Sequence, residues 1–146
     1  MAADLGVSFK RFVQSPGMEY ALRRTSTKTF PDALAAARAL LAKEGFGILS
    51  EIDIQAKMKE KLGQDMPPYL ILGACAPPLA WKTLGAVPDI GVFLPCNVCV
   101  YVDAAGKTVV SAIDPDTMQA LIQHPVVAEV AKDVKGRLQR VVDGTA

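Results

Sequence analysis

The short spacing between strand-like runs limits the folds that this chain can adopt. Runs rich in β-forming residues lie at 18–25, 46–53 and 67–75, and two more, within residues 90–114, flank a turn at 103–107. Parallel neighbours in a sheet need a connection of about a dozen residues or more, usually a helix. Among these connections only residues 31–44 have the pattern of a full-length helix. We therefore expect an α+β fold with an antiparallel-rich sheet and helices on one face.

Prolines and aspartates mark where the expected helices begin. Pro31 opens a helix that Gly45 ends, because proline suits the first helical turn and glycine the position after the last. Asp53 caps a helix at 54–63, and further helices follow at 77–86, 114–123 and 124–144. Their inward positions are Leu34, Ala37 and Leu41; Ile54, Met58 and Leu62; Leu79 and Leu84; and Val127, Val130, Val134, Leu138 and Val141. The strand at 46–53 should alternate, with Ile48, Ser50 and Ile52 on one face.

The composition predicts a single domain that associates with copies of itself. With 146 residues, the chain has the size of one domain, residues 1–146. Charged residues make up 21% and the formal net charge is +1, so no field of one sign favours nucleic acid or anionic lipid. We expect no nucleic-acid partner. Hydrophobic residues reach 51%, which in so small a domain favours a homo-oligomer, a dimer first.

The chain shows no signal for export or membrane insertion. Its N-terminal residues include Asp4 and no apolar block of signal-peptide length. The longest uncharged stretch, residues 66–81, is broken by prolines and a glycine and is shorter than the roughly 20 apolar residues that span a bilayer. Three cysteines, an odd number, are expected to be reduced thiols. We therefore expect a cytoplasmic protein with no membrane partner.

Two of the cysteines form a C-x-x-C pattern that the strand period argues against as a redox or zinc motif. Cys96 and Cys99 lie in a strand-like run, where positions three apart point to opposite faces. Without a bulge, they cannot face one metal or form an easy disulfide.

Cys75 and Cys96 are better candidates than Cys96 and Cys99 for a site that two thiols share. If their strands are antiparallel neighbours, the end of one lies beside the start of the other, and both thiols share one end of the sheet. Buried cysteine usually acts as a small hydrophobe. A reactive thiol needs an electropositive neighbour, which for Cys75 is the helix that starts at Pro77. Core filler and functional thiol both remain open.

Glu51 and Asp53 lie two residues apart on one strand face, a spacing that suits a cation site or an acid and base pair. The alternative is that Asp53 caps a helix and Glu51 is a solvated sheet residue. His124 precedes a proline at a helix start and is expected at the surface. Trp81 on a short helix is expected in the core or at an interface.

Three blocks of this sequence resemble a known family. "KEGFGILSEIDIQAKMKEKLG" is followed by "YLILGAC" and later by "DIGVFLPCNVCVY", in an order and spacing similar to those of the domain of unknown function family 302. The resemblance covers residues 18–143 and leaves residues 1–17 as an N-terminal extension. It implies a TATA-binding-protein-like fold, which is a curved antiparallel sheet with two main helices on one face, usually in homo-oligomers. It implies no established activity.

The cysteine blocks of the family fall on residues 73–75 and 94–97. Where the family commonly has asparagine after the first cysteine, this chain has Ala76. The change removes a polar group beside Cys75 and weakens the case for a complete polar site. Cys99 lies outside the family pattern, in agreement with the strand-period argument.

Three classes of function remain open. The first is a binding or interaction module that holds a small ligand or a soft metal such as Cu(I) or Zn(II), with Cys75, Cys96, Asn97 and Glu51 as candidate ligand-binding residues. The second is a thiol-dependent enzyme that uses Cys75 as its nucleophile. The third is an interaction protein with no site. The sequence pairs no base with Cys75, because the only histidine, His124, is remote. Binding or interaction is therefore favoured, and the sequence assigns no cofactor and no catalytic residue.

Overall fold

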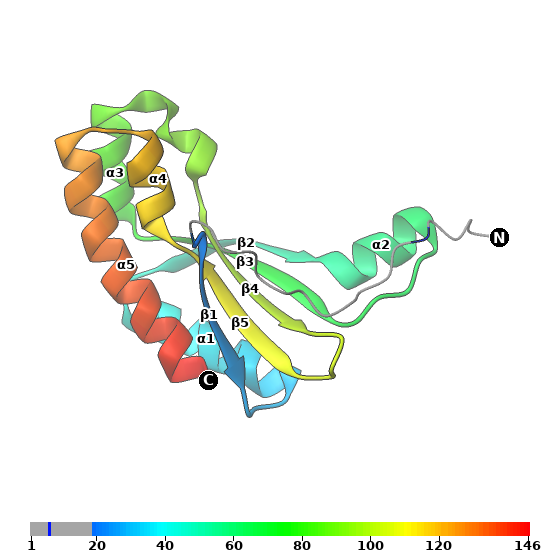
Figure 1. Cartoon of the computed structure of the whole chain (residues 1–146). Coiled ribbons are helices and arrows are strands. Elements are labelled where there is room, and N and C mark those ends of the chain that lie inside the picture. The colour runs from blue at the N-terminus through cyan, green and yellow to red at the C-terminus, as the bar shows by residue number, and fades with distance from the viewer. Residues whose placement is uncertain (1–5, 7–18) are drawn as a thin grey trace.

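A five-stranded antiparallel sheet forms the centre of the molecule. The computed structural model describes Gly6 and residues 19–146, so most of the expected extension at 1–17 lies outside the described residues. The elements are β1 (Ala21–Ser26), α1 (Phe30–Lys43), β2 (Gly47–Asp53), α2 (Ile54–Leu62), β3 (Tyr69–Cys75), α3 (Pro77–Ala86), the 3-10 helix η1 (Pro88–Phe93), β4 (Cys96–Val102), β5 (Thr108–Ile113), α4 (Pro115–Leu121) and α5 (Pro125–Thr145). The strand order is β1-β5-β4-β3-β2, and all neighbours are antiparallel (Figure 1).

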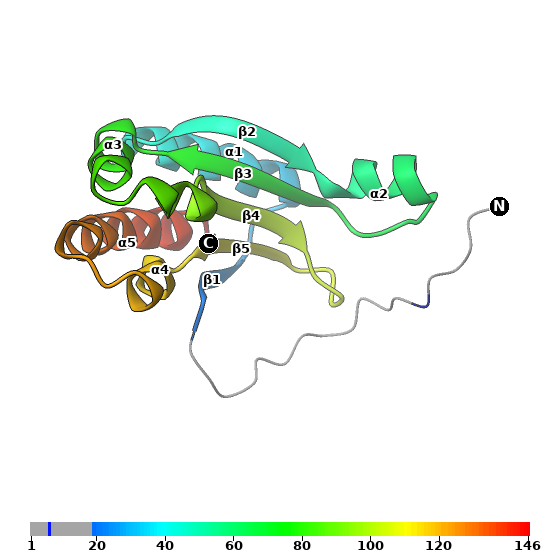
Figure 2. The ribbon, with the colours of Figure 1, turned by 90° about the horizontal axis from the view of Figure 1, so that it is seen from above.

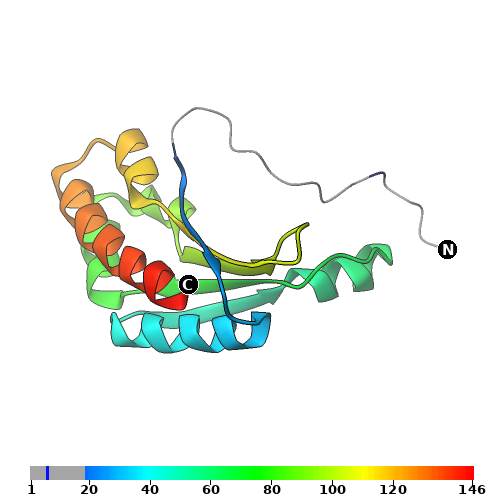
Figure 3. The ribbon, with the colours of Figure 1, turned by 60° about the horizontal axis from the view of Figure 1, so that its bottom comes forward.

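Helices α1 and α5 pack side by side on one face of this sheet. Figure 3 shows them together in front of the strands, and Figure 2 shows the curvature of the strands. Side chains fully buried between the two layers include Leu41, Leu72, Val98, Val100 and Leu138. The structure confirms the predicted α+β class, the antiparallel sheet and the two main helices on one face.

The sequence predicts the two main helices well because their signals are local. Helix α1 begins where the Thr29 side chain accepts a hydrogen bond from the Asp32 N–H, and it ends before Gly45, whose φ of +84° suits glycine. In α5 the whole predicted stripe is buried, namely Val127, Val130, Val134, Leu138 and Val141. A helix whose apolar residues all lie on one side is stabilised most by packing that side against a sheet.

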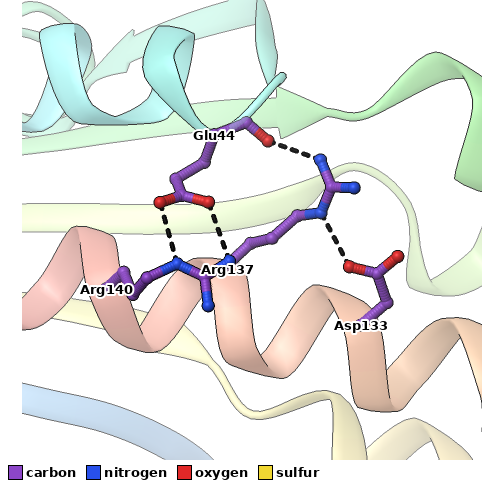
Figure 4. Close-up of polar contacts among 4 residues, drawn as sticks. All are labelled: Glu44, Asp133, Arg137 and Arg140. Atoms are coloured by element: carbon purple, nitrogen blue, oxygen red, sulfur yellow. Dashed lines mark hydrogen bonds and ion pairs between the residues drawn. The ribbon is translucent and has the colours of Figure 1, made fainter.

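Ionic contacts join the end of α1 to α5 (Figure 4). Arg140 donates two hydrogen bonds of 2.9 Å to the Glu44 carboxylate, one to each oxygen. Arg137 donates to the Glu44 backbone carbonyl at 2.7 Å and to the Asp133 carboxylate at 2.7 Å. Arg137 thus satisfies a carbonyl that the helix end leaves without an intrahelical partner.

A β-bulge in the edge strand β2 corrects the predicted alternation. The register shifts between Ile48 and Ser50, so Ile48 pairs with Ala74 while Ser50 pairs with Gly73. Ile48 therefore packs toward the helix-covered core, and Ser50 lies on the opposite face. The prediction that both share a face was wrong because a bulge inserts one extra residue, which a strict period of two does not contain.

Several inward positions and one strand start also differ from the prediction. None of the residues of α2 is buried, and the helix lies beyond the end of β2, away from α1 and α5 (Figures 1 and 2). In α3 the buried position is Thr83, whereas Leu84 is 40% exposed. The segment before β4 is the 3-10 helix η1 rather than strand, because Pro88 and Gly91 favour a turn-like backbone over a strand. Short helices at the sheet margin have little surface to pack on, so local apolar spacing is a weak guide there.

Within Gly6 and residues 19–146, no helix combines the length and the apolar character that crossing a bilayer requires.

Candidate functional site

Cys75 and Cys96 line one small cavity at an end of the sheet. Strand pairing places Cys96 opposite Ala74, so Cys75 lies one residue further along β3. The cavity offers about 40 Å³ in which the centre of a water molecule can move, and α3, η1 and α4 contribute to its wall. Figure 1 shows α3 and α4 at this end of the sheet, opposite to the β4–β5 turn. The two residues thus lie at the same end of the sheet. Strand alternation puts Cys75 on the face of Gly73 and Cys96 on the face of the buried Val98, so close contact of the two sulfurs stays a prediction.

This cavity does not provide what a nucleophilic thiol needs. The pKa of Cys96 is raised to about 11, chiefly by burial and to a smaller extent by the charge of Cys75. The Cys96 thiol is therefore protonated at neutral pH. None of the described residues that line the cavity is His, Asp, Glu, Lys or Arg, so neither a base nor a cation activates a thiol there.

The other two candidate residues lie elsewhere. Asn97 follows Cys96 in β4 and faces the other side of the sheet, opposite Gly73. Glu51 on the edge strand forms an ion pair with Arg38, whose Nη2 donates a 2.9 Å hydrogen bond to it. Asp53 accepts a 2.8 Å hydrogen bond from the Ala56 N–H and caps α2. Cys75 and Cys96 therefore lie at one end of the sheet, Asn97 faces the other side of the sheet from Cys96, and Glu51 lies apart on the edge strand.

Two further residues that the sequence singles out have simple positions. His124 caps α5, with its Nδ1 accepting a hydrogen bond of 3.1 Å from the Val126 N–H. Trp81 on α3 is 80% exposed and does not belong to the core. Among the residues that the structure describes, no group of three or more His, Cys, Asp or Glu side chains is placed to hold a metal ion.

The sheet face opposite to α1 and α5 carries a large groove. Its volume, again the space open to the centre of a water molecule, is about 940 Å³. This lies near the upper end of the roughly 300–1,000 Å³ typical of ligand pockets. Strand pairing sets Arg23, Ser111, Cys99 and Ile71 side by side across four strands. Next to them lies a second row of Thr25, Val109, Tyr101 and Tyr69. We call this surface the open-face groove.

A pair of tyrosines forms the aromatic part of the open-face groove. The rings of Tyr69 and Tyr101 stack with centroids 5.0 Å apart and an interplanar angle of 13°. Burial raises the pKa of both phenols, so each keeps its proton at neutral pH. The Tyr69 hydroxyl hydrogen-bonds to the Cys99 sulfur, and Arg23 hydrogen-bonds to Tyr101.

Burial also raises the pKa of Cys99, against the smaller lowering effect of its hydrogen bond with Tyr69. Cys99 lines the open-face groove, whereas Cys96 lines the cavity beside the helices. The two cysteines of the C-x-x-C pattern thus point to opposite faces, as the strand period predicts.

Apart from Asn97, the residues that shape the open-face groove were not predicted from the sequence. Their signal is present, because Tyr69 and Ile71 alternate in β3 and Cys99 and Tyr101 alternate in β4 on the face that the helices leave open. What the sequence lacks is the strand order that places Arg23 of β1 beside β5. Without that strand order, nothing distinguishes Arg23 from the other lysines and arginines, which number sixteen in all.

The fold and the groove together define a two-layer α+β protein with helices on one side of its sheet and an open, partly aromatic surface on the other. The model of the family "Domain of unknown function DUF302" matches residues 22–145, so the chain belongs to this family. The match confirms the resemblance seen in the three sequence blocks.

A solved structure supports this assignment. The crystal structure of the uncharacterized conserved protein DUF302 from Bacillus stearothermophilus is 27% identical in sequence, with a TM-score of 0.81. The alignment covers 88% of this chain and 100% of that one. No curated protein matches the chain.

Proposed function

We propose that this protein is a binding module that holds a small planar organic acid in the open-face groove. The observation that carries the proposal is a groove of about 940 Å³ that combines a stacked tyrosine pair, Arg23 and hydrogen-bonding side chains on one sheet face. Ligand pockets typically combine apolar and aromatic walls with a few placed polar groups. The side chains of the groove itself indicate the class of ligand.

The side chains of the groove favour a flat ligand with a negative charge. The Tyr69 and Tyr101 rings are nearly parallel, with an interplanar angle of 13°, and aromatic faces prefer offset stacking on another flat ring. Arg23 adds a positive charge beside Tyr101, and a guanidinium suits the two oxygens of a carboxylate. Ser111 and Asn97, which also line the groove, supply further hydrogen-bonding groups.

The proposal is tested by titrating the full chain with 2-naphthoate and with its neutral analogue 2-naphthamide, using calorimetry or NMR. We expect the acid to bind at least about five-fold tighter, since a charge-assisted hydrogen bond is stronger than a neutral one. Arg23→Gln should remove this preference. Tyr101→Leu should weaken both ligands, because both would stack on the ring.

Arg24 provides the matched control. It is the next residue in β1, on the helix side of the sheet, where its Nε lies 3.1 Å from an Asp143 carboxylate oxygen. Arg24→Gln makes the same chemical change as Arg23→Gln and should leave the preference for the acid unchanged. The proposal fails if neither probe binds, or if Arg23→Gln and Arg24→Gln have equal effects.

The thiol-dependent enzyme remains the alternative function, and no contact in the structure favours it. Its chief candidate, Cys75, lines a cavity whose described residues include no base.

We also propose that two copies of the chain associate through the apolar surface of α3 and η1. Trp81 is 80% exposed on α3 and Val92 is 84% exposed on η1, two segments that contact each other. A stable interface buries about 800 Å² per partner, and large aromatic side chains are enriched at its centre. Light scattering at tens of micromolar should give twice the mass of one chain, and Trp81→Lys should give the single-chain mass. Leu62→Lys, at an exposed apolar position of α2, is the control that should stay dimeric.

We further propose a cytoplasmic location, which fits three cysteines that are all free thiols. Fractionation of cells that carry the full chain tests this, and recovery outside the cytoplasm would contradict it.

A further inference from the structure

The small cavity beside Cys96, which we call the α3–α4 cavity, has an almost wholly apolar wall. Figure 1 shows α3, α4 and the first turns of α5 gathered at this end of the sheet. The space open to the centre of a water molecule is about 40 Å³, whereas one water requires roughly 10–15 Å³. The cavity therefore has room for a group of a few heavy atoms. We infer that it is a binding site for the apolar end of a short aliphatic molecule.

The side chains of the wall offer little to a polar or charged ligand. None of the described residues that line the cavity is His, Asp, Glu, Lys or Arg. The Thr83 hydroxyl already donates to the Ala80 carbonyl at 3.0 Å. Because burial raises the pKa of Cys96 to about 11, that thiol is neutral at pH 7, and a thiol is a weak hydrogen-bond donor. Burying a polar group without a hydrogen bond costs free energy, so the cavity favours hydrocarbon.

Small side chains leave this space unfilled. Ala74 and Ala76 are buried in the wall, and Ala80 of α3 is half-buried there. Protein interiors are close-packed, and voids larger than a water molecule are few in one domain. Hydrocarbon in the cavity would supply the dispersion contacts that the wall otherwise lacks. Each methylene that leaves water for the cavity should also raise the affinity about fourfold.

Part of the wall is accessible to a ligand from the solvent. Phe46 and Ala74 in the wall are buried. Leu79, Leu94 and Met118 are only half-buried. They belong to α3, to the segment between η1 and β4, and to α4. An aliphatic chain that enters on this side can therefore place its apolar end in the cavity and leave its polar end in water.

The experiment is an NMR titration of the isotope-labelled full chain with 1-butanol, 1-pentanol and 1,5-pentanediol. We expect 1-pentanol to bind about fourfold tighter than 1-butanol, because it buries one more methylene. The diol has the length of 1-pentanol but a hydroxyl at both ends. It should bind at least about fivefold more weakly than 1-pentanol, because one hydroxyl would be buried without a hydrogen bond.

A pair of alanine substitutions in α3 tests the location. Ala80 lines the cavity, so Ala80→Leu should fill the space and abolish the binding of 1-pentanol. Ala86→Leu is the matched control, because Ala86 is the last residue of the same helix and lies outside the cavity wall. This variant should bind 1-pentanol as the wild type does.

A measurement on the unmodified protein covers the case in which Ala80→Leu fails to fold. Nuclear Overhauser contacts from 1-pentanol should reach the methyl groups of Leu79 and Met118 in the cavity, and not the Tyr101 ring in the open-face groove. The inference is overturned if 1-pentanol does not bind, if the diol binds as tightly, or if Ala80→Leu and Ala86→Leu have equal effects. Overhauser contacts confined to the open-face groove would also overturn it.

Discussion

Gly73→Ala provides a strict test of how closely the strands pack beside the open-face groove. A Cβ added at Gly73 would lie 2.2 Å from the Ser50 Oγ of β2 and 2.9 Å from the Pro95 Cγ before β4. Both distances are below the van der Waals contact of about 3.5 Å for carbon. The Ser50 hydroxyl can rotate away, but the ring of Pro95 is fixed to its backbone. Methylene-sized overpacking costs about 1–3 kcal/mol, and the two contacts together lead us to expect about 2 kcal/mol.

Urea unfolding followed by circular dichroism measures this cost. With a denaturant slope of about 2 kcal/mol/M, a loss of about 2 kcal/mol lowers the midpoint by about 1 M. Gly85→Ala is the control, because a Cβ there meets no atom within 4 Å. Since Gly85 lies in α3, that change should raise stability by about 0.5–1 kcal/mol.

A double-mutant cycle identifies the contact responsible. Ser50→Ala removes the Oγ and leaves a Cβ 3.6 Å from the new methyl group, an ordinary contact. In that background Gly73→Ala should cost less, with the remainder due to Pro95. The reasoning is refuted if Gly73→Ala is as stable as the wild type, or if Ser50→Ala leaves its cost unchanged.

Three further predictions concern the core, the ion pair and the buried thiol. Leu138→Ala, at a fully buried position, should cost about 3 kcal/mol, whereas Leu121→Ala, at a position 69% exposed, should change stability by less than about 0.5 kcal/mol; equal urea midpoints would contradict this. The hydrogen bonds from Arg140 hold the pKa of Glu44 below its usual 4.5. Glu44→Gln should therefore lose stability at neutral pH, and the loss should vanish as the pH falls below 4.5 through the folded-state pKa; a pH-independent difference would contradict the ion pair. Alkylation of Cys96, followed by mass spectrometry, should speed up about tenfold per pH unit toward its pKa of about 11, and a rate that levels off by about pH 9 would contradict its burial.

The sequence predicts those parts of the fold that depend on local signals. The α5 stripe, the α3 limits at Pro77 and Ala86 and the turn at 103–107 follow from helical spacing, proline placement and a glycine-containing turn. The bulge at Ile48–Ser50 could not be predicted, because it is a property of the register between β2 and β3. That register depends on which side chains of the two strands can be buried in the core.

The candidate site residues also divide into those set by local signals and those set by the whole fold. The location of Cys75 and Cys96 at one end of the sheet follows from a short connection between neighbouring antiparallel strands, so sequence reasoning reached it. Met118 lines the same cavity as Cys96 only because α4 folds back over the end of the sheet, and Arg23 reaches the tyrosines only because β1 pairs with β5. Contacts between segments this distant in the chain depend on the whole fold, and no local pattern encodes them.

The most direct test of the proposed binding function is an NMR titration of the isotope-labelled full chain with 2-naphthoate. The account predicts that the amide shifts gather on the open-face rows, at residues such as Arg23, Cys99 and Ser111, and leave the buried stripe of α5 unchanged. Shifts that gather on α5, or on α3 and η1, would contradict it, as would the absence of any shift at millimolar ligand.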